Sequence, residues 1–285
     1  MAGTISRRLF TKALACCAFG GLNRAEEGTP QRKLLSIAEV EQFLQTAEVI
    51  KKRLTKVGLT SPVRVTLSNA AMTHDAHVQR VDVSKPTFET LAGMELNFRD
   101  SWKFNVAGYR MDRLLGLNMT PISVARKFEG RSAAFTWWID DAMMEGERQR
   151  KKIEPPDVET FNRQMQVLRV FDQLICNTDR NQQNILITKD WKLWMIDHTR
   201  AFRTLKIVRT PKNLVRCERR LLEKMRGLSQ EALNGELGEY LLGREIEGVL
   251  ARRDLIVKTF EEKIAIEGES RVLYDLPPRE PAYLA

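Results

Sequence analysis

The chain has 285 residues, of which 43% are hydrophobic, a composition that supports one large core or two packed lobes and excludes a disordered chain or a disulfide miniprotein. No apolar run reaches the roughly 18 residues of a membrane-spanning helix, and the cysteines show no zinc-binding spacing, although a Cys176–Cys217 disulfide stays open. The formal charge of +9 indicates either a partner that carries phosphate or simply a basic soluble surface.

Residues 1–25 have the pattern of an export signal. Arg7 and Arg8 are followed by Phe10 and Lys12, and then by a mildly apolar stretch with small residues at a suitable cleavage point. This order is typical of the twin-arginine route. We therefore expect an exported, periplasmic protein; the alternative is an N-terminal arm on a cytoplasmic protein.

The next segments predict a helix followed by strands. Residues 36–54 carry apolar side chains at helical spacing, so that residues 26–54 are predicted to be a linker and an N-terminal helix. Alternating apolar residues predict two strands, over 62–69 and 73–83. A loop that contains Lys85 is expected to follow them.

A strong helix and a hairpin complete this half of the chain. Residues 103–117 have one apolar side, and Gly116 stands near the end, where a helix commonly stops. Residues 120–140 predict a hairpin, because apolar residues alternate on both sides of a turn at Glu129 and Gly130.

A charged segment, residues 142–157, lacks apolar periodicity and contains two adjacent prolines, which indicates a hinge between lobes. The first lobe is then residues 55–141 and the second lobe residues 158–285. The second lobe has helical patterns over 158–175, 215–225, 229–242 and 244–266. The fold class expected is α+β, with a small β-rich lobe that has one key helix and a mainly helical second lobe.

Oxygen-bearing side chains gather around a short apolar ribbon early in the second lobe. Asp179 and Asn184 are separated by four residues, and Asp197 follows two apolar runs, 185–187 and 193–196. A catalytic Asp and a metal-binding Asn have this separation in protein kinases, where a second metal-binding Asp follows. Such oxygens suit Mg²⁺. The alternative is a helix end and a hairpin with ordinary turn hydrogen bonds.

Two segments resemble atypical kinases. Residues 177–198, NTDRNQQN…WMIDH, resemble the catalytic and metal-binding loops of phosphatidylinositol 3- and 4-kinases, HipA-type kinases and Golgi casein kinases. Residues 104–124 resemble the helix and following strand of the small lobe in the last two groups. The resemblance covers about residues 55–205. It implies a two-lobed protein-kinase-like fold, and the export signal points to a bacterial exported branch.

The resemblance also implies a role for each residue of the stretch. Asp179 would be the catalytic residue that orients or deprotonates the acceptor hydroxyl, and Arg180 would lie beside it in the catalytic loop. Asn184 and Asp197 would bind the Mg²⁺ or Mn²⁺ that accompanies ATP.

The small lobe departs from the kinase pattern. The strand lysine that contacts ATP phosphates and the helix glutamate that holds it align with Gln79 and Asn105, two neutral amides on the ATP side of the site. Losing the charged contact would weaken phosphate binding by about 2–3 kcal/mol. Four residues could replace the pair: Lys85 or Arg80 for the lysine, and Glu95 or Asp100 for the glutamate.

Two further residues border the expected site. Trp138, at the end of the predicted hairpin, is a candidate to line an adenine pocket; the alternative is that it packs the hairpin. His198 stands where a glycine usually follows the metal-binding aspartate. We expect it to pack beside the site, because Mg²⁺ prefers oxygen ligands.

Three functions are consistent with these patterns. The first is an ATP- and divalent-metal-dependent phosphotransferase that acts on a hydroxyl of a protein, lipid or small molecule. The second is a pseudokinase that binds or scaffolds, because Gln79 and Asn105 are uncharged. The third is a basic protein that binds nucleic acid or a membrane surface. No nucleic-acid motif accompanies the basic runs, so no nucleic-acid partner is expected, whereas contact with a membrane surface stays open.

Overall fold

The computed structural model describes residues 34–54, 63–90, 93–280 and 283–284. The predicted export signal, residues 1–25, lies outside them. Of the helices that the structure describes, none has the length and apolar character that crossing a bilayer requires.

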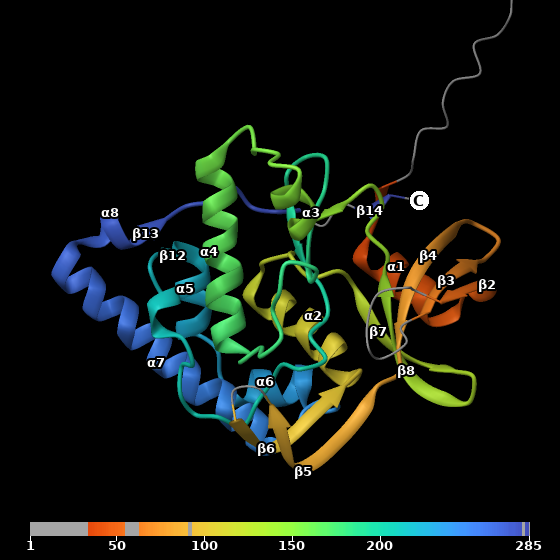
Figure 1. Cartoon of the computed structure of the whole chain (residues 1–285), viewed down its shortest axis with the longest axis horizontal. Coiled ribbons are helices and arrows are strands. Elements are labelled where there is room, and N and C mark those ends of the chain that lie inside the picture. The colour runs from red at the N-terminus through yellow and green to blue at the C-terminus, as the bar shows by residue number, and fades with distance from the viewer. Residues whose placement is uncertain (1–33, 55–62, 91–92, 281–282, 285) are drawn as a thin grey trace, which may run out of the picture. The chain divides into compact units, whose positions relative to one another are not determined.

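A five-stranded antiparallel sheet forms the first lobe (Figure 1). On it packs α1 (Ile37–Thr46), which buries Val40, Phe43 and Leu44 against the side of β7 and β8. The strands predicted over 62–69 and 73–83 are confirmed as β3 and β4, although β4 ends at Gln79 and residues 82–83 belong to the next strand, β5 (Asp82–Thr90). The strands, in their order across the sheet, are β2 Glu48–Leu54, β3 Val63–Ser68, β4 Thr73–Gln79, β8 Arg131–Trp137 and β7 Ser123–Phe128.

The helix predicted over 36–54 ends early. Ser36 caps α1 by accepting the N–H of Glu39, whose carboxylate accepts the N–H of Ser36 in return. Directly after Thr46 the backbone becomes extended and enters β2, which pairs with β3. The prediction is wrong beyond that point, because β-branched residues such as Val49 favour a strand once a partner strand is present.

The second lobe is mainly helical and is built around α4 and α7 (Figure 1). Its helices are α3 Glu145–Arg150, α4 Val158–Leu174, η1 Pro211–Asn213, α5 Arg219–Arg226, α6 Gln230–Leu237, α7 Gly243–Glu267 and α8 Glu269–Val272. Its strands are β9 Met143–Met144, β10 Ile185–Ile187, β11 Leu193–Met195, β12 Cys217–Glu218 and β13 Leu273–Tyr274. The segment predicted as a hinge, 142–157, thus contains β9 and α3.

Short strand pairs tie this lobe together. β9, β10 and β11 form one antiparallel sheet, and β12 pairs with β13 in parallel. β1 (Leu34–Leu35) pairs with β14 (Tyr283–Leu284), which brings the two described ends of the chain side by side. Cys176 and Cys217 are buried free thiols, so the disulfide that the sequence left open is not formed.

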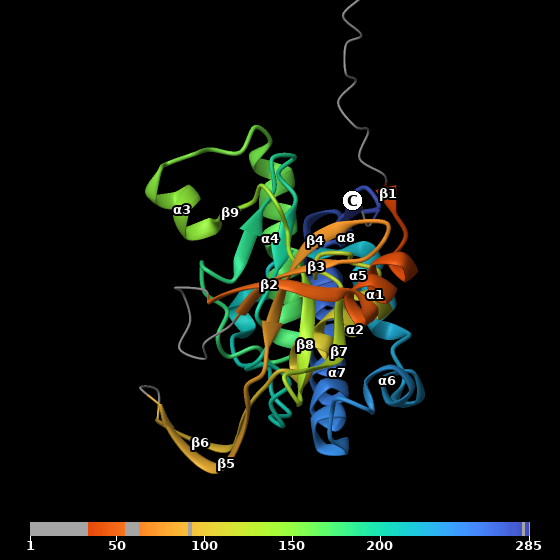
Figure 2. The same cartoon turned by 90° about the vertical axis from the view of Figure 1, so that its right-hand side faces the viewer.

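The segment around Lys85, which was expected to be a loop, forms a two-stranded hairpin that projects from the sheet (Figure 2). Phe88 and Phe98 stack with their ring centroids 4.0 Å apart, and the Glu95 carboxylate forms a 2.6 Å ion pair with Arg203 of the helical lobe. Apolar and ionic contacts thus order a segment that was predicted to be a loop. Its strands are β5 Asp82–Thr90 and β6 Gly93–Ser101.

The predicted helix at 103–117 is confirmed as α2 (Lys103–Leu115), which lies between the lobes. It contacts β7 and β8 on one side and α5 and α6 on the other. Gly116 ends it with a left-handed φ of 68°. The predicted hairpin turn is also confirmed, because Glu129 and Gly130 both have positive φ, 49° and 79°, as a two-residue hairpin turn of this type requires.

Candidate active site

The β10–β11 ribbon brings two predicted metal-binding residues together. Asn184 directly precedes β10 and Asp197 follows β11. Because the strands are antiparallel, with Ile185 opposite Met195, their outer ends meet, and the N–H of Ile196 donates to the carbonyl oxygen of Asn184 (3.2 Å). The sequence placed both residues at this ribbon, and the structure makes them neighbours.

Asp179 lies on the loop that connects α4 to the ribbon. Its N–H donates to Oδ1 of Asn177 (3.0 Å), and its carbonyl oxygen accepts from Nδ2 of Asn184 (3.1 Å). Burial raises the pKa of the Asp179 carboxyl; Arg200 opposes this shift, and the negative charge of Asp197 adds to it. Asp179, Asn184 and Asp197 therefore lie in one electrostatic and hydrogen-bonding neighbourhood.

Arg180 holds the loop to the ribbon from the buried side. Its guanidinium forms a 2.9 Å ion pair with Asp172 of α4, and Nη1 donates to the carbonyl oxygens of Asn184 (2.6 Å) and Ile196 (2.7 Å). Nη2 lies 3.1 Å from Nε2 of His198. Arg180 lies beside Asp179 on the loop between α4 and β10, and its contacts are those of a residue that positions this loop.

His198 is a packed side chain, as the sequence predicted, and it lies between α2 and α4. Its ring is 1% exposed, lies edge-on to Phe171 and fills the space beside Gly108 of α2, where an added Cβ would come within 2.9 Å of the ring. Burial lowers the pKa of His198 well below its ordinary value, and Arg180 adds to the effect. A neutral imidazole therefore joins α2 to the loop that carries Asp197.

The two amides of the small lobe hydrogen-bond to backbone N–H groups. Oδ1 of Asn105 accepts the N–H of His198 (2.7 Å), which ties α2 to the loop that carries Asp197. Oε1 of Gln79 accepts the N–H groups of Arg80 (2.9 Å) and Val81 (3.1 Å) at the end of β4. Both side chains are buried. They fix backbone, and neither supplies positive charge.

The charged residues that could replace the missing pair lie in different surroundings. Lys85 is exposed on β5, with its ammonium 5.0 Å from the Phe88 ring. Arg80 pairs with Glu129 on the far hairpin (2.8 Å). Glu95 pairs with Arg203 in the helical lobe. Of the four, Asp100 comes nearest the proposed metal site.

Asp100, at the end of β6, belongs to the carboxylate cluster. Burial raises its pKa, Thr199 and Arg200 oppose the shift, and the charge of Asp197 adds to it. Its Oδ1 is buried and has no hydrogen-bond partner among the described residues. Such a group usually marks an absent ligand or water.

Two residues near the site were missed from the sequence. Arg200 lies with Nη1 4.0 Å from Oδ1 of Asp179, and its guanidinium is 5.1 Å from the Phe98 ring. The negative charge of Asp197 raises the pKa of His77 in β4, but burial has the larger effect and lowers that pKa overall. The alternation of side chains along a strand could have predicted the position of His77, because residues two apart, such as His77 and Gln79, face the same side.

Trp138 follows β8 at the entrance to the second lobe. The Arg64 guanidinium stacks on its ring at 3.9 Å from the centroid, and a 2.6 Å ion pair with Asp75 holds that guanidinium in place. The N–H of Trp138 donates to the Asp75 carbonyl oxygen (3.2 Å). One face of the indole is thus covered by a cation from β3.

The oxygen atoms available to a cation come from two residues. Nδ2 of Asn184 is used, while its Oδ1 has no hydrogen-bond donor within the part of the chain that the structure describes. Oδ1 of Asp197 accepts the Thr199 hydroxyl (3.0 Å). Hard oxygen donors of this kind fit Mg²⁺ or Mn²⁺, which bind few protein ligands and keep several waters.

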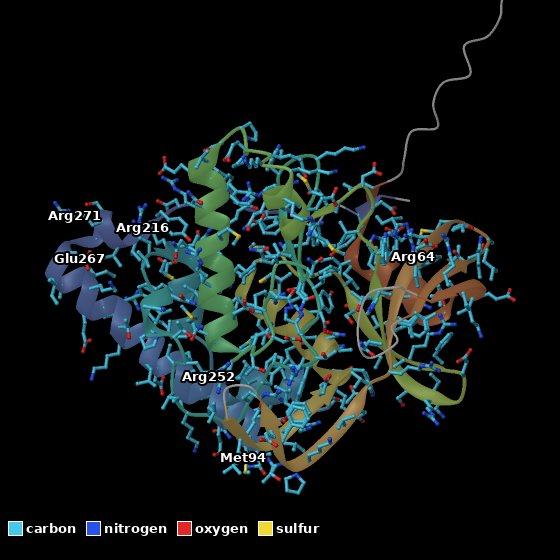
Figure 3. The ribbon with its side chains drawn as sticks, in the orientation of Figure 1. Arg64, Met94, Arg216, Arg252, Glu267 and Arg271 are labelled. Atoms are coloured by element: carbon cyan, nitrogen blue, oxygen red, sulfur yellow. The ribbon has the colours of Figure 1, made fainter. Side chains whose placement is uncertain are left out.

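A buried arginine of α7 holds the segment that follows Asp197. Arg252 of α7 is fully buried (its position is labelled in Figure 3). It donates to the carbonyl oxygens of Leu174 and Arg203, both at 2.8 Å. The end of α4 and the segment that follows Asp197 are therefore held at one point.

No family model matches the chain, and no curated protein matches it. Solved structures do match. A hydra Fam20 structure with sugar is 13% identical, with a TM-score of 0.62 over 84% of this chain and 92% of that one. A Golgi casein kinase structure is 13% identical, with a TM-score of 0.60 over 86% and 80%. Another, with Mn/ADP bound, is 14% identical, with a TM-score of 0.60 over 85% and 80%. The chain has an atypical protein-kinase-like fold.

This kinase-like fold confirms the predicted two-lobed architecture. The sheet with α1 and α2 is the small lobe, and the helices from α4 onward are the large lobe. The loop with Asp179 and the ribbon with Asn184 and Asp197 lie in the large lobe, and α2 faces them through Asn105.

Proposed function

We propose that the chain is an ATP- and divalent-metal-dependent phosphotransferase that acts on a hydroxyl group. The observation that carries the proposal is the meeting of Asp179, Asn184 and Asp197 at the end of one ribbon, within a kinase-like fold. The Mn/ADP in one similar structure supports the same cofactors.

Each residue then has a chemical role. Asn184 and Asp197 would hold the cation, which neutralises phosphate oxygens when bound. The acceptor oxygen bonds to the terminal phosphorus of ATP, ADP leaves, and the hydroxyl proton passes to the Asp179 carboxylate. The raised pKa of Asp179 makes it a better proton acceptor than an ordinary aspartate. Arg200 limits the rise in the pKa of Asp179, and its positive charge would attract phosphate.

Thermal unfolding tests nucleotide binding. For protein that lacks residues 1–25, we expect Mg²⁺ or Mn²⁺ with ATP to raise the melting temperature, because a ligand that binds only the folded state stabilises it. Asp197→Ala should remove the shift. Asp254→Ala, which changes an exposed aspartate on α7, should keep it. No shift with either metal at millimolar ATP would contradict the proposal.

The second candidate function is a pseudokinase that binds a partner without turnover. It is favoured by Gln79 and Asn105, because both amides bond to backbone and neither offers a charge to phosphate. Transfer of label from γ-labelled ATP separates the two functions. Metal-dependent labelling that is lost in Asp179→Ala would exclude the pseudokinase, whereas a folded protein without any labelling would support it.

A further inference from the structure

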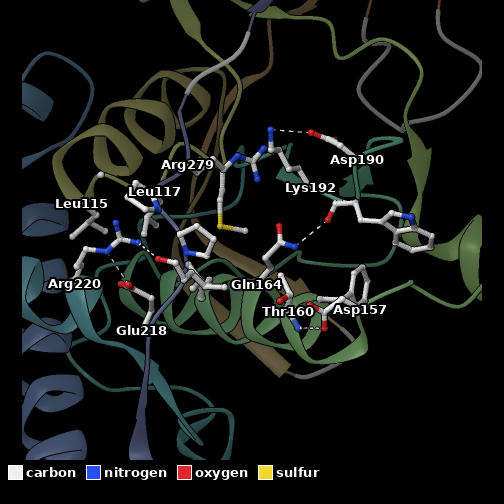
Figure 4. Close-up of a pocket in the computed structure, with 18 of the residues that line it drawn as sticks. Leu115, Leu117, Asp157, Thr160, Gln164, Asp190, Lys192, Glu218, Arg220 and Arg279 are labelled. Carbon is white, nitrogen blue, oxygen red and sulfur yellow. Dashed lines mark hydrogen bonds and ion pairs between the residues drawn. The ribbon is translucent and has the colours of Figure 1, made fainter.

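A cavity of about 590 Å³ lies in the helical lobe, and Figure 4 shows residues of its wall. Its wall includes the end of α2, the first turns of α4, the turn of the β10–β11 ribbon, the start of α5 and the C-terminal segment 276–279. Asp179, Asn184 and Asp197 are not part of the wall. The volume falls in the range of small-molecule sites, about 300–1,000 Å³.

Most of the wall is apolar, with side chains such as Leu117, Phe161 and Trp191. The amide of Gln164 is satisfied within the protein, because Nε2 donates to the Trp191 carbonyl oxygen and Oε1 accepts the N–H of Leu193, each at 3.0 Å. The wall therefore favours an apolar ligand body and leaves the polar contacts to its charged residues.

The anions in the wall are already neutralised. Asp190 pairs with Lys192 (2.8 Å), and Glu218 pairs with Arg220 (3.0 Å). The third, Asp157, caps α4 by accepting the N–H of Thr160, where the positive end of the helix dipole balances it.

Two cations in the wall lie outside these ion pairs. Arg279 donates through Nη1 to the Leu193 carbonyl oxygen (2.5 Å) and stacks on Trp194, and the carboxylates of Asp112 and Asp190 act on its charge. Lys224 is exposed and has neither an ion pair nor a hydrogen bond to its ammonium among the residues described. Its ammonium is therefore the uncompensated positive charge at the wall, which suits an anionic group.

We propose that this cavity binds a free monoanionic amphiphile, with its apolar body against the walls and its carboxylate or similar head near Lys224 and Arg279. The inference does not rest on the proposed phosphotransfer, because the wall shares no residue with that site. Either an acyl chain or an aromatic ring can form the apolar body of such a ligand.

Calorimetric titration of the full chain tests the proposal. Decanoate and 1-naphthoate serve as acyl and aromatic anions, decanol as a neutral probe and decyltrimethylammonium as a cationic one. We expect saturable binding of one anion per chain and weaker binding of the neutral and cationic probes. Tighter binding of decanoate would identify an acyl ligand, and tighter binding of 1-naphthoate an aromatic one. Equal binding of decanol and decanoate, or binding only to vesicles of anionic lipid, would overturn the proposal.

Three variants place the binding in this cavity. Thr160→Trp fills it from a half-exposed wall position and should weaken anion binding at least tenfold. Lys224→Glu should weaken anions about fivefold, as expected for one solvent-facing charge, and leave decanol unchanged. Lys212→Glu, an exposed position on η1 outside the wall, is its matched control.

The fold of each variant is checked by the cooperativity of thermal unfolding. If Thr160→Trp does not fold, the comparison of Lys224→Glu with Lys212→Glu decides. Equal anion affinity in those two variants would overturn the proposal. Asp197→Ala should bind the anions unchanged, so that a failure here is distinguishable from a failure of the phosphotransferase proposal.

Discussion

The two walls of the proposed active site differ in the kind of side chain that they contribute. The large-lobe wall carries charge in Asp179, Asp197 and Arg200, whereas the two small-lobe positions that align with the kinase lysine and glutamate carry the amides Gln79 and Asn105. In the usual kinase pattern, one ion pair both positions the helix and contacts phosphate. In this chain a neutral hydrogen bond positions α2. In the proposed phosphotransferase, helix positioning and phosphate charge would therefore be separate tasks.

The largest effect is expected on the charged wall. Asp179→Asn removes the proton acceptor, so that phosphoryl transfer should fall on the order of a hundredfold or more. The ATP-dependent rise in melting temperature should remain, because the metal-binding residues are intact. Transfer of label from γ-labelled ATP measures the first quantity and thermal unfolding the second. Turnover that survives the change would mean that the charged wall is not the catalytic one.

The next largest effect is expected at Asn105, the neutral amide of α2. Asn105→Ala leaves the buried N–H of His198 without its acceptor, which should lower the free energy of unfolding by about 1–3 kcal/mol. It should also lower turnover about tenfold, because the loop that carries Asp197 loses its tie to α2. Urea denaturation and the transfer assay measure the two changes.

The matched control for Asn105 is an exposed asparagine in the catalytic loop. Asn181→Ala removes two hydrogen bonds at an exposed position, one from the N–H of Gln183 (2.8 Å) and one to the carbonyl oxygen of Asp179 (3.1 Å), so stability should change by no more than about 0.5 kcal/mol. Similar losses at Asn181 and Asn105 would show that the α2 contact has no special weight.

α2 does carry a buried carboxylate, at the end remote from the site. Oδ2 of Asp112 accepts the N–H groups of Met119 (2.8 Å) and Thr120 (2.9 Å), and burial raises its pKa to about 6. Between the ordinary Asp value and pH 6 the folded state therefore binds more protons than the unfolded state. Stability from this group is full below that range and falls as the pH rises through it.

Asp112→Asn should flatten this part of the stability profile. The expected change between pH 4 and pH 6 is on the order of 2 kcal/mol, measured as the difference in unfolding free energy between variant and parent at each pH. An unchanged slope would show that the carboxyl is not perturbed. Turnover should be little affected, which distinguishes this end of α2 from the end that carries Asn105.

The same contrast between walls governs what could be predicted from the sequence. The large-lobe residues lie within one stretch, so their spacing carried the information that Asp179, Asn184 and Asp197 lie close together. The small-lobe contacts are long-range. The bond between Asn105 and His198 spans 93 positions, and no local pattern reports it. The β5–β6 hairpin was missed for a similar reason, because Arg203 of the other lobe helps to hold it.

The smallest effect is expected where Gly108 of α2 packs against His198, the residue that follows Asp197. Gly-to-Ala in a helix normally raises stability by about 0.5–1 kcal/mol, and Gly235→Ala in α6 should do so, because its added Cβ has open space. Gly108→Ala should instead lower stability by about 1 kcal/mol, because the new Cβ would press on the buried His198 ring at 2.9 Å. Displacing that ring should also reduce turnover. Equal gains in both variants would show that His198 yields freely and that α2 does not control the loop.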